Sequence, residues 1–86
     1  MAEHGTDKAS EAQLREYDRE GVITAAKILR EPDGYVLVIR LTWKTNNVVL
    51  YNYRDRPRTW ASLDRILAHL AEVAPSIKVL ELVLQQ

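Results

Sequence analysis

The chain has 86 residues, of which 47% are hydrophobic and 28% are charged, a balance that suits one small globular domain. It has no cysteine, which excludes disulfides, thiolate zinc sites and a cysteine nucleophile. Its net charge is zero, which argues against a protein that coats DNA through general basicity. No apolar run approaches the roughly 20 residues of a membrane span, and the first residues lack a signal core, so we expect a cytoplasmic protein.

The N-terminal residues 1–9 are polar and without periodicity, and we expect a flexible tail followed by one domain over residues 10–86. Ser10 precedes Gln13 by three residues, the spacing of a capping box at the start of a helix. Gly21 is a natural end for that helix, because glycine accepts the left-handed conformation of a C-cap. The pattern therefore predicts a short helix over residues 10–20.

Two β-prone segments follow, over residues 22–30 and 35–44. Between them lies Pro32-Asp33-Gly34, a combination typical of a tight turn. In the second segment every odd-numbered residue is apolar, and this period of two predicts a half-buried strand. The row of this segment that we expect in the core is Leu37, Ile39, Leu41 and Trp43.

The pair Asn46-Asn47 sits where this strand should turn back, and asparagine tolerates a two-residue hairpin turn. With that turn, Arg40 faces Tyr53 across the strand pair. Side chains that face each other share one side of a sheet, so this register predicts a basic and aromatic face opposite the core row. A slip by one residue would exchange the two faces.

Residues 59–74 have the apolar spacing of an amphipathic helix, with Thr59 as the expected N-cap and Trp60 at the head of the buried stripe. Pro75 should end this helix, and residues 77–85 read as a final strand. The predicted fold is α+β: a short N-terminal helix, a three-stranded antiparallel sheet, one amphipathic helix on one face and a C-terminal strand, in the order α-β-β-β-α-β.

The sequence holds no strong catalytic or metal-binding motif. His69 and Glu72 share a helical face, but two ligands do not make a metal site, and we expect a solvated pair. Ser62 and His69 are about 10 Å apart on a helix, beyond hydrogen-bond reach. The three glycines form no phosphate-binding loop. We therefore expect a protein without enzymatic activity, cofactor or metal.

Charge is distributed unevenly, and residues 35–60 hold five basic residues against Asp55 alone, a net charge of +4. Basic residues beside aromatic ones are typical of surfaces that bind single-stranded nucleic acid, in which phosphates meet the cations and bases stack on the rings. The predicted phosphate contacts are Arg40, Lys44, Arg54, Arg56 and Arg58, and the predicted stacking residues are Tyr51 and Tyr53.

Two other interpretations remain open for the same sheet face. The first is an ordinary solvated face, since tyrosine and threonine favour strands for packing reasons alone. The second is a protein-interaction or homodimerisation module, in which Val36 and Val38 form an apolar patch on the open sheet face. The terminal strand could also pair across a two-fold axis in a dimer.

The run RDRPRTWASLDRILAHL, residues 54–70, resembles a segment of short uncharacterised proteins from bacterial plasmids and integrative elements. In that segment a Pro-Arg pair and an aromatic residue precede x-Ser-Leu-Asp. The resemblance implies an accessory protein of mobile DNA. The order of three strands before a helix also looks like that of single-strand-binding coactivators, which dimerise through the helix, although the final strand departs from it. Fold likeness alone does not carry function.

Overall fold

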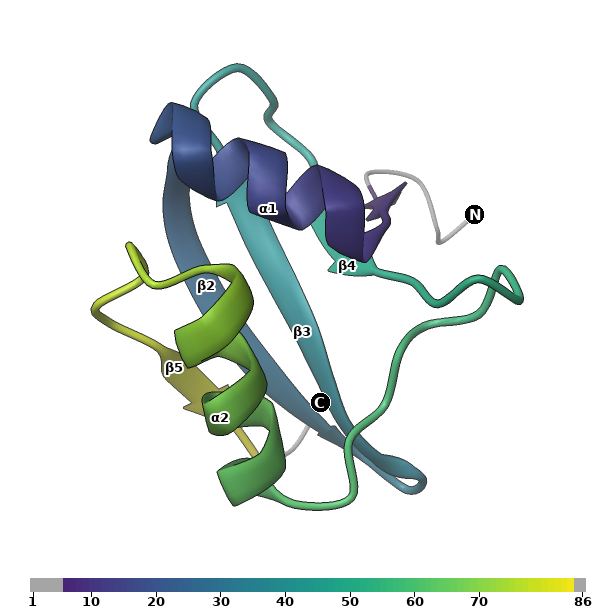
Figure 1. Ribbon diagram of the computed structural model, residues 1–86. Helices are drawn as coiled ribbons and strands as arrows, with labels where there is room; N and C mark the ends of the chain where they lie inside the picture. Colours follow the sequence, from purple (N-terminus) through teal and green to yellow (C-terminus); the bar gives the residue numbers. More distant parts are fainter. Residues whose placement is uncertain (1–5, 85–86) are drawn as a thin grey trace.

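The computed structural model describes residues 6–84 and confirms the α+β class (Figure 1). The elements in chain order are β1 (Thr6–Ala9), α1 (Glu11–Glu20), β2 (Ile23–Glu31), β3 (Gly34–Leu41), β4 (Asn47–Leu50), α2 (Leu63–Val73) and β5 (Glu81–Val83). The five strands form one mixed open sheet in the order β1-β4-β3-β2-β5. Its centre is the predicted antiparallel trio β2, β3 and β4, and the two outer strands pair in parallel with their neighbours.

Helix α1 begins and ends where the sequence predicts. The side chain of Ser10 accepts a hydrogen bond from Gln13 N, and the side chain of Gln13 accepts one from Ser10 N. Gly21 ends the helix in the left-handed conformation, with φ of 70°. The reciprocal bonds satisfy backbone donors that an uncapped helix end leaves unpaired, and so they stabilise the first turn of α1.

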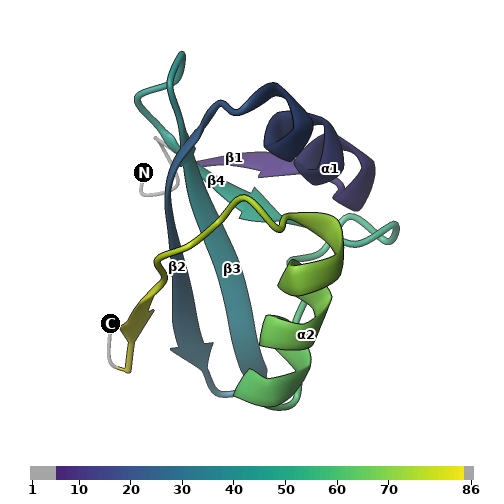
Figure 2. The ribbon, with the colours of Figure 1, turned by 60° about the vertical axis from the view of Figure 1, so that its left-hand side comes forward.

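Both helices lie on the same face of the sheet (Figures 1 and 2). Leu37, Ile39 and Leu41 are buried beneath them, as predicted, together with Leu14 of α1 and Ile66 of α2. The prediction that Trp43 continues this core row is wrong: β3 ends at Leu41, and Trp43 lies in the connection after it, where it is 56% exposed. Because successive side chains of a strand alternate, the even-numbered residues of β3 lie on the other face, which no helix covers. We call this second face the open face.

The prediction of a flexible tail over residues 1–9 is wrong for residues 6–9, which form strand β1. Residues 6–9 pair in parallel with β4, and Ala9 is buried in the core. The short polar run has no alternation of its own, so its place in the sheet depends on β4 rather than on its own sequence. Residues 1–5 of the expected tail lie outside the described residues.

The predicted two-residue turn at Asn46-Asn47 is wrong. β3 ends at Leu41, residues 42–46 form a longer connection, and the observed pairs are Val38 with Val49 and Ile39 with Val48. Asp7 of β1 accepts hydrogen bonds from the side chains of Lys44 and Asn46, and so holds the connection in its longer form. Tyr53 therefore lies beyond β4, and Arg40 does not face it.

Helix α2 begins later than predicted, because Ser62 and not Thr59 is its N-cap. Trp60 lies before the helix, where its backbone bonds in both directions to Tyr35 of β3. Its side chain is buried in the core, as predicted. The helix ends at Val73 with Ala74 as its cap, just before Pro75. No helix within residues 6–84 is long and apolar enough to cross a bilayer.

We expect Gly34→Ala to destabilise the fold. Gly34 has φ of 138°, and a Cβ there would lie 2.5 Å from the backbone oxygen of Trp60. Backbone cannot move aside without breaking the bonds between Tyr35 and Trp60, so we expect a loss of about 2–4 kcal/mol in the free energy of unfolding. Urea unfolding followed by circular dichroism measures it.

The matched control is Gly21→Ala, where nothing lies within 4 Å of the added carbon and only the positive φ opposes it. This variant should lose about 1–2 kcal/mol. Equal losses in the two variants would contradict the tight approach at Gly34.

Candidate nucleic-acid interface

The sequence between β4 and α2 folds into a small hairpin, which we call the arginine hairpin (residues 51–58). Tyr51 pairs with Pro57 at its base. At its tip Asp55 N donates to Asn52 O, and Asn52 N donates to Arg56 O. Asp55 has φ of 63°, the left-handed conformation that aspartate tolerates in turns.

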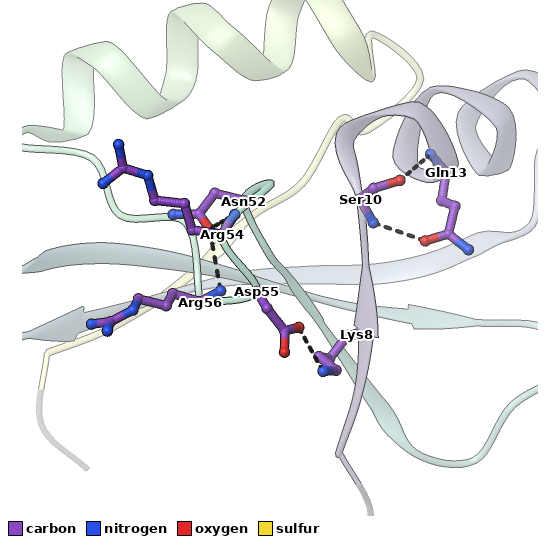
Figure 3. Close-up of polar contacts among 7 residues, drawn as sticks. All are labelled: Lys8, Ser10, Gln13, Asn52, Arg54, Asp55 and Arg56. Atoms are coloured by element: carbon purple, nitrogen blue, oxygen red, sulfur yellow. Dashed lines mark hydrogen bonds and ion pairs between the residues drawn. The ribbon is translucent and has the colours of Figure 1, made fainter.

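Asn52 holds the tip in place. Its side-chain oxygen accepts hydrogen bonds from Arg54 N at 2.8 Å and from Arg56 N at 3.2 Å (Figure 3). Asp55 makes a 2.7 Å ion pair with Lys8 of β1, and this partner raises the pKa of Lys8. The side chains of Arg54 and Arg56 extend away from that ion pair in Figure 3. The hairpin is therefore fixed at both its backbone and its one acidic side chain.

The hairpin presents an exposed aromatic residue beside two exposed arginines, Arg54 and Arg56. Tyr53 is 90% exposed, and the guanidinium of Arg54 lies 5.4 Å from the centre of its ring. Among residues 6–84, no carboxylate lies within ion-pair distance of Arg54 or Arg56. With respect to the described part of the chain, these two cations are available to an outside anion.

A hollow of about 670 Å³ separates the arginine hairpin from the first turn of α1. Tyr51, Tyr53 and Arg58 line it on the hairpin side, and Ser10 and Glu11 line it on the helix side. The ammonium of Lys8 lies 5.1 Å from the centre of the Tyr51 ring. Three residues predicted to bind nucleic acid thus share one concave surface, which is open to solvent.

Arg58 belongs to a second polar group that sequence reasoning missed, which we call the Glu11 cluster (Glu11, Arg15, Arg58, Trp60 and His69). Glu11 lies 3.0 Å from Arg15, 3.1 Å from His69 Nε2 and 3.7 Å from Arg58. The guanidinium of Arg58 stacks 4.9 Å from the Trp60 ring. His69 Nε2 is buried, and its approach to Glu11 is not aligned as a hydrogen bond.

The predicted pair of His69 with Glu72 is therefore wrong, because His69 faces α1 and Trp60 instead. Glu11 and His69 are 58 positions apart in the chain, and only the docking of α1 beside α2 brings them together. The spacing of residues within α2 could not indicate this contact, because Glu11 belongs to another helix.

Two of the predicted phosphate contacts lie away from the arginine hairpin. Lys44 is in the β3–β4 connection, which is well separated from the hairpin in Figures 1 and 2. It makes a 3.0 Å ion pair with Asp7, and this hydrogen bond lowers the pKa of Asp7. Arg40 is exposed on β3, where it pairs with Ala25. The seven predicted residues thus do not form one surface.

Val36 and Val38 lie on the open face, as predicted, but they do not protrude. They are 7% and 3% exposed and lie in a hollow of about 620 Å³ whose rim includes Glu31, Asp33 and Arg56. The two carboxylates oppose a phosphate there. The open face therefore suits nucleic acid less well than the other side of the arginine hairpin does.

Within residues 6–84, no group of three or more histidine, aspartate or glutamate side chains could hold a metal ion. Comparisons with protein-family models, with curated proteins and with solved structures find no match to this chain. The interface therefore has to be judged by its own geometry.

Glu11→Gln should weaken the fold in a pH-dependent way. Arg15 lowers the pKa of Glu11 most, His69 and Arg58 lower it further, and burial opposes them. Because the folded pKa is below its ordinary value of 4.5, the stabilisation is present above that pH and is lost as the pH falls through the folded pKa. Glu11 is 38% exposed, so we expect only about 0.5–1 kcal/mol at neutral pH.

Unfolding of Glu11→Gln and of the parent protein, from neutral pH into the acid range, measures the difference between their free energies of unfolding. This difference should shrink on acidification. Glu72→Gln is the control, since Glu72 is an exposed glutamate of α2 and should change little. A difference between Glu11→Gln and the parent protein that stays constant with pH would contradict the ion-pair role.

Asn52→Ala should loosen the hairpin tip without unfolding the domain. It removes the acceptor of two amide hydrogens, so the free energy of local opening at Arg54 and Arg56 should fall by about 1 kcal/mol. Amide hydrogen exchange at these two residues measures it. Asn46→Ala, in the other connection, should leave both amides unchanged.

Proposed function

We propose that this protein binds single-stranded nucleic acid through the arginine hairpin, without enzymatic activity. The observation that carries the proposal is the hollow that brings Tyr51, Tyr53 and Arg58 together beside the exposed Arg54. Single strands are held by such a combination, because every base has a face that stacks on an aromatic ring and every phosphate attracts a nearby cation.

Each side chain has a distinct role in the proposal. Tyr53 stacks on an exposed base, since a ring 90% open to water gains contact area only from a partner. Tyr51 lines the inner wall of the hollow and receives a second base. Arg54 and Arg56 contact phosphates, because the described residues offer them no carboxylate. Arg58 lies 3.7 Å from Glu11, which partly neutralises it, and it contacts a phosphate at the edge of the hollow.

The contacts that order the arginine hairpin favour affinity for a nucleic acid and also fix the positions of the binding side chains. Asn52, the Lys8–Asp55 ion pair and the backbone bridge of Tyr51 to Pro57 order the tip before any ligand arrives. Binding then costs less conformational entropy than it would from a mobile loop. Lys44 and Arg40 have no part in this revised surface. The resemblance of residues 54–70 to a segment of plasmid proteins is consistent with a role in mobile DNA.

The first test is titration of the purified protein into a fluorescent single-stranded oligonucleotide of about 15 nucleotides, near the upper site size of small single-strand-binding domains. Saturable binding that weakens with salt is expected. Tyr53→Ala should cost about 1–3 kcal/mol of binding free energy, the usual value of one stacked base. Arg54→Ala with Arg56→Ala should lower the salt slope by about 1.4, the release expected for two single-strand phosphates.

The matched control is Arg19→Ala with Arg65→Ala, which changes the net charge equally at exposed sites on the two helices. This control should leave the salt slope close to that of the parent. Absence of binding at low salt, where electrostatic attraction is strongest, would contradict the proposal. Equal decreases of the salt slope in the two double variants would also contradict it, because binding would then reflect net charge alone.

A further inference from the structure

The two edges of the sheet differ in chemistry. The β1 edge carries Asp7 and Lys8, and both are engaged in ion pairs, with Lys44 and Asp55 respectively. Charged side chains on an edge strand discourage pairing with another strand. The β5 edge carries Glu81, but its neighbours are apolar and open to water. Leu82 is 42% exposed and Leu84 is 54% exposed.

The exposed leucines of β5 lie on the side of the sheet that the helices cover. Leu82 pairs with Ile28 of β2, whose side chain is in the core, so Leu82 projects from the same face. Alternation places Leu80 and Leu84 on that face as well, and Leu80 already packs against the core. An apolar row thus continues from the core to the rim of the sheet and ends in solvent.

We propose that β5 is the contact through which two copies of this chain form a homodimer, by antiparallel pairing of β5 with β5 about a two-fold axis perpendicular to the sheet. The free N–H and C=O groups of an edge strand are satisfied by another strand. A second copy fits because the leucine row matches itself across the axis. With the axis at Leu82, Leu82 faces its own copy and Leu80 faces Leu84.

The register follows from side-chain chemistry. An axis at Glu81 would set two carboxylates directly opposite each other, which destabilises a strand pair. An axis at Leu82 places Glu81 opposite Val83 and joins the leucines of the two copies into one apolar row. The helices of both copies then lie on one face of a ten-stranded sheet, and the arginine hairpins stay at the far side of each copy from the contact.

The experiment is analytical ultracentrifugation of the full chain from low micromolar to near millimolar concentration. The mass should rise with concentration from 9.9 kDa toward twice that value. Leu82→Lys should raise the dimer dissociation constant about tenfold or more, because it sets like charges opposite each other at the axis. Trp43→Lys is the control, since Trp43 is also exposed, at 56%, but lies in the β3–β4 connection, and it should leave the dimer intact.

A cross-link keeps the test decisive if Leu82→Lys fails to fold. The chain has no cysteine, so Leu82→Cys introduces one thiol per copy. Facing residues of an antiparallel pair lie about 4.5–5.5 Å apart between Cα atoms, within the reach of a disulfide. Leu82→Cys should oxidise to a covalent dimer far faster than Ala68→Cys, on the exposed side of α2. A mass that stays at one copy throughout, a dimer that survives Leu82→Lys, or equal cross-linking of the two thiols would overturn the proposal.

Discussion

Two backbone hydrogen bonds between Tyr35 and Trp60 organise the part of the chain that matters most for function. Tyr35 N donates to Trp60 O at 2.9 Å, and Trp60 N donates to Tyr35 O at 3.0 Å. They dock the segment before α2 against the start of β3, beyond the residues that β4 pairs with, and they carry the Trp60 indole into the core. Gly34 permits this approach because it has no Cβ. The arginine hairpin is consequently held at its far end, while Tyr51 N bonds to Ala9 O at its near end.

The same bridge separates the basic residues into two groups. Once Trp60 is buried, Arg58 stacks on its ring and meets Glu11, so this cation serves partly to join the hairpin to α1. Arg54 and Arg56 lie at the tip, beyond the reach of the described carboxylates, and stay available for an outside anion. The three arginines thus perform two tasks, because Arg54 and Arg56 lie at the tip of the hairpin and Arg58 lies at its base beside Trp60 and Glu11.

One-sided coverage of the sheet has consequences at its rim. Two short helices cover only part of one face, and the apolar row of β2 and β3 continues into β5 without cover. At the other rim, ion pairs of Asp7 and Lys8 satisfy the charged edge within the monomer. The fold therefore has one edge suited to solvent and one suited to another strand. The proposed ligand surface and the proposed dimer contact occupy different parts of the molecule, so neither obstructs the other.

Local signals in the sequence predicted most of the elements correctly. The capping box at Ser10, the stop at Gly21 and the turn at Pro32-Asp33 act within a few residues, so the sequence alone reveals them. Burial of Leu37, Ile39 and Leu41 followed from their alternation. Within the candidate interface, Tyr51, Tyr53, Arg54, Arg56 and Arg58 were named from composition alone. The hollow that Tyr51, Tyr53 and Arg58 share with α1 leaves no signal in the sequence, because it depends on the packing of α1 beside the hairpin.

The amino-acid sequence by itself determined the α+β class, the position of α1 and the burial of Leu37, Ile39 and Leu41, because each depends on spacing between near neighbours. Tertiary structure alone decided the strand register, the place of β1, the start of α2 and the partners of Glu11. Each of these depends on contacts between distant residues, such as Asp7 with Lys44 or Tyr35 with Trp60. Such contacts leave no periodic trace in a single sequence, since either partner alone looks like an ordinary surface or strand residue.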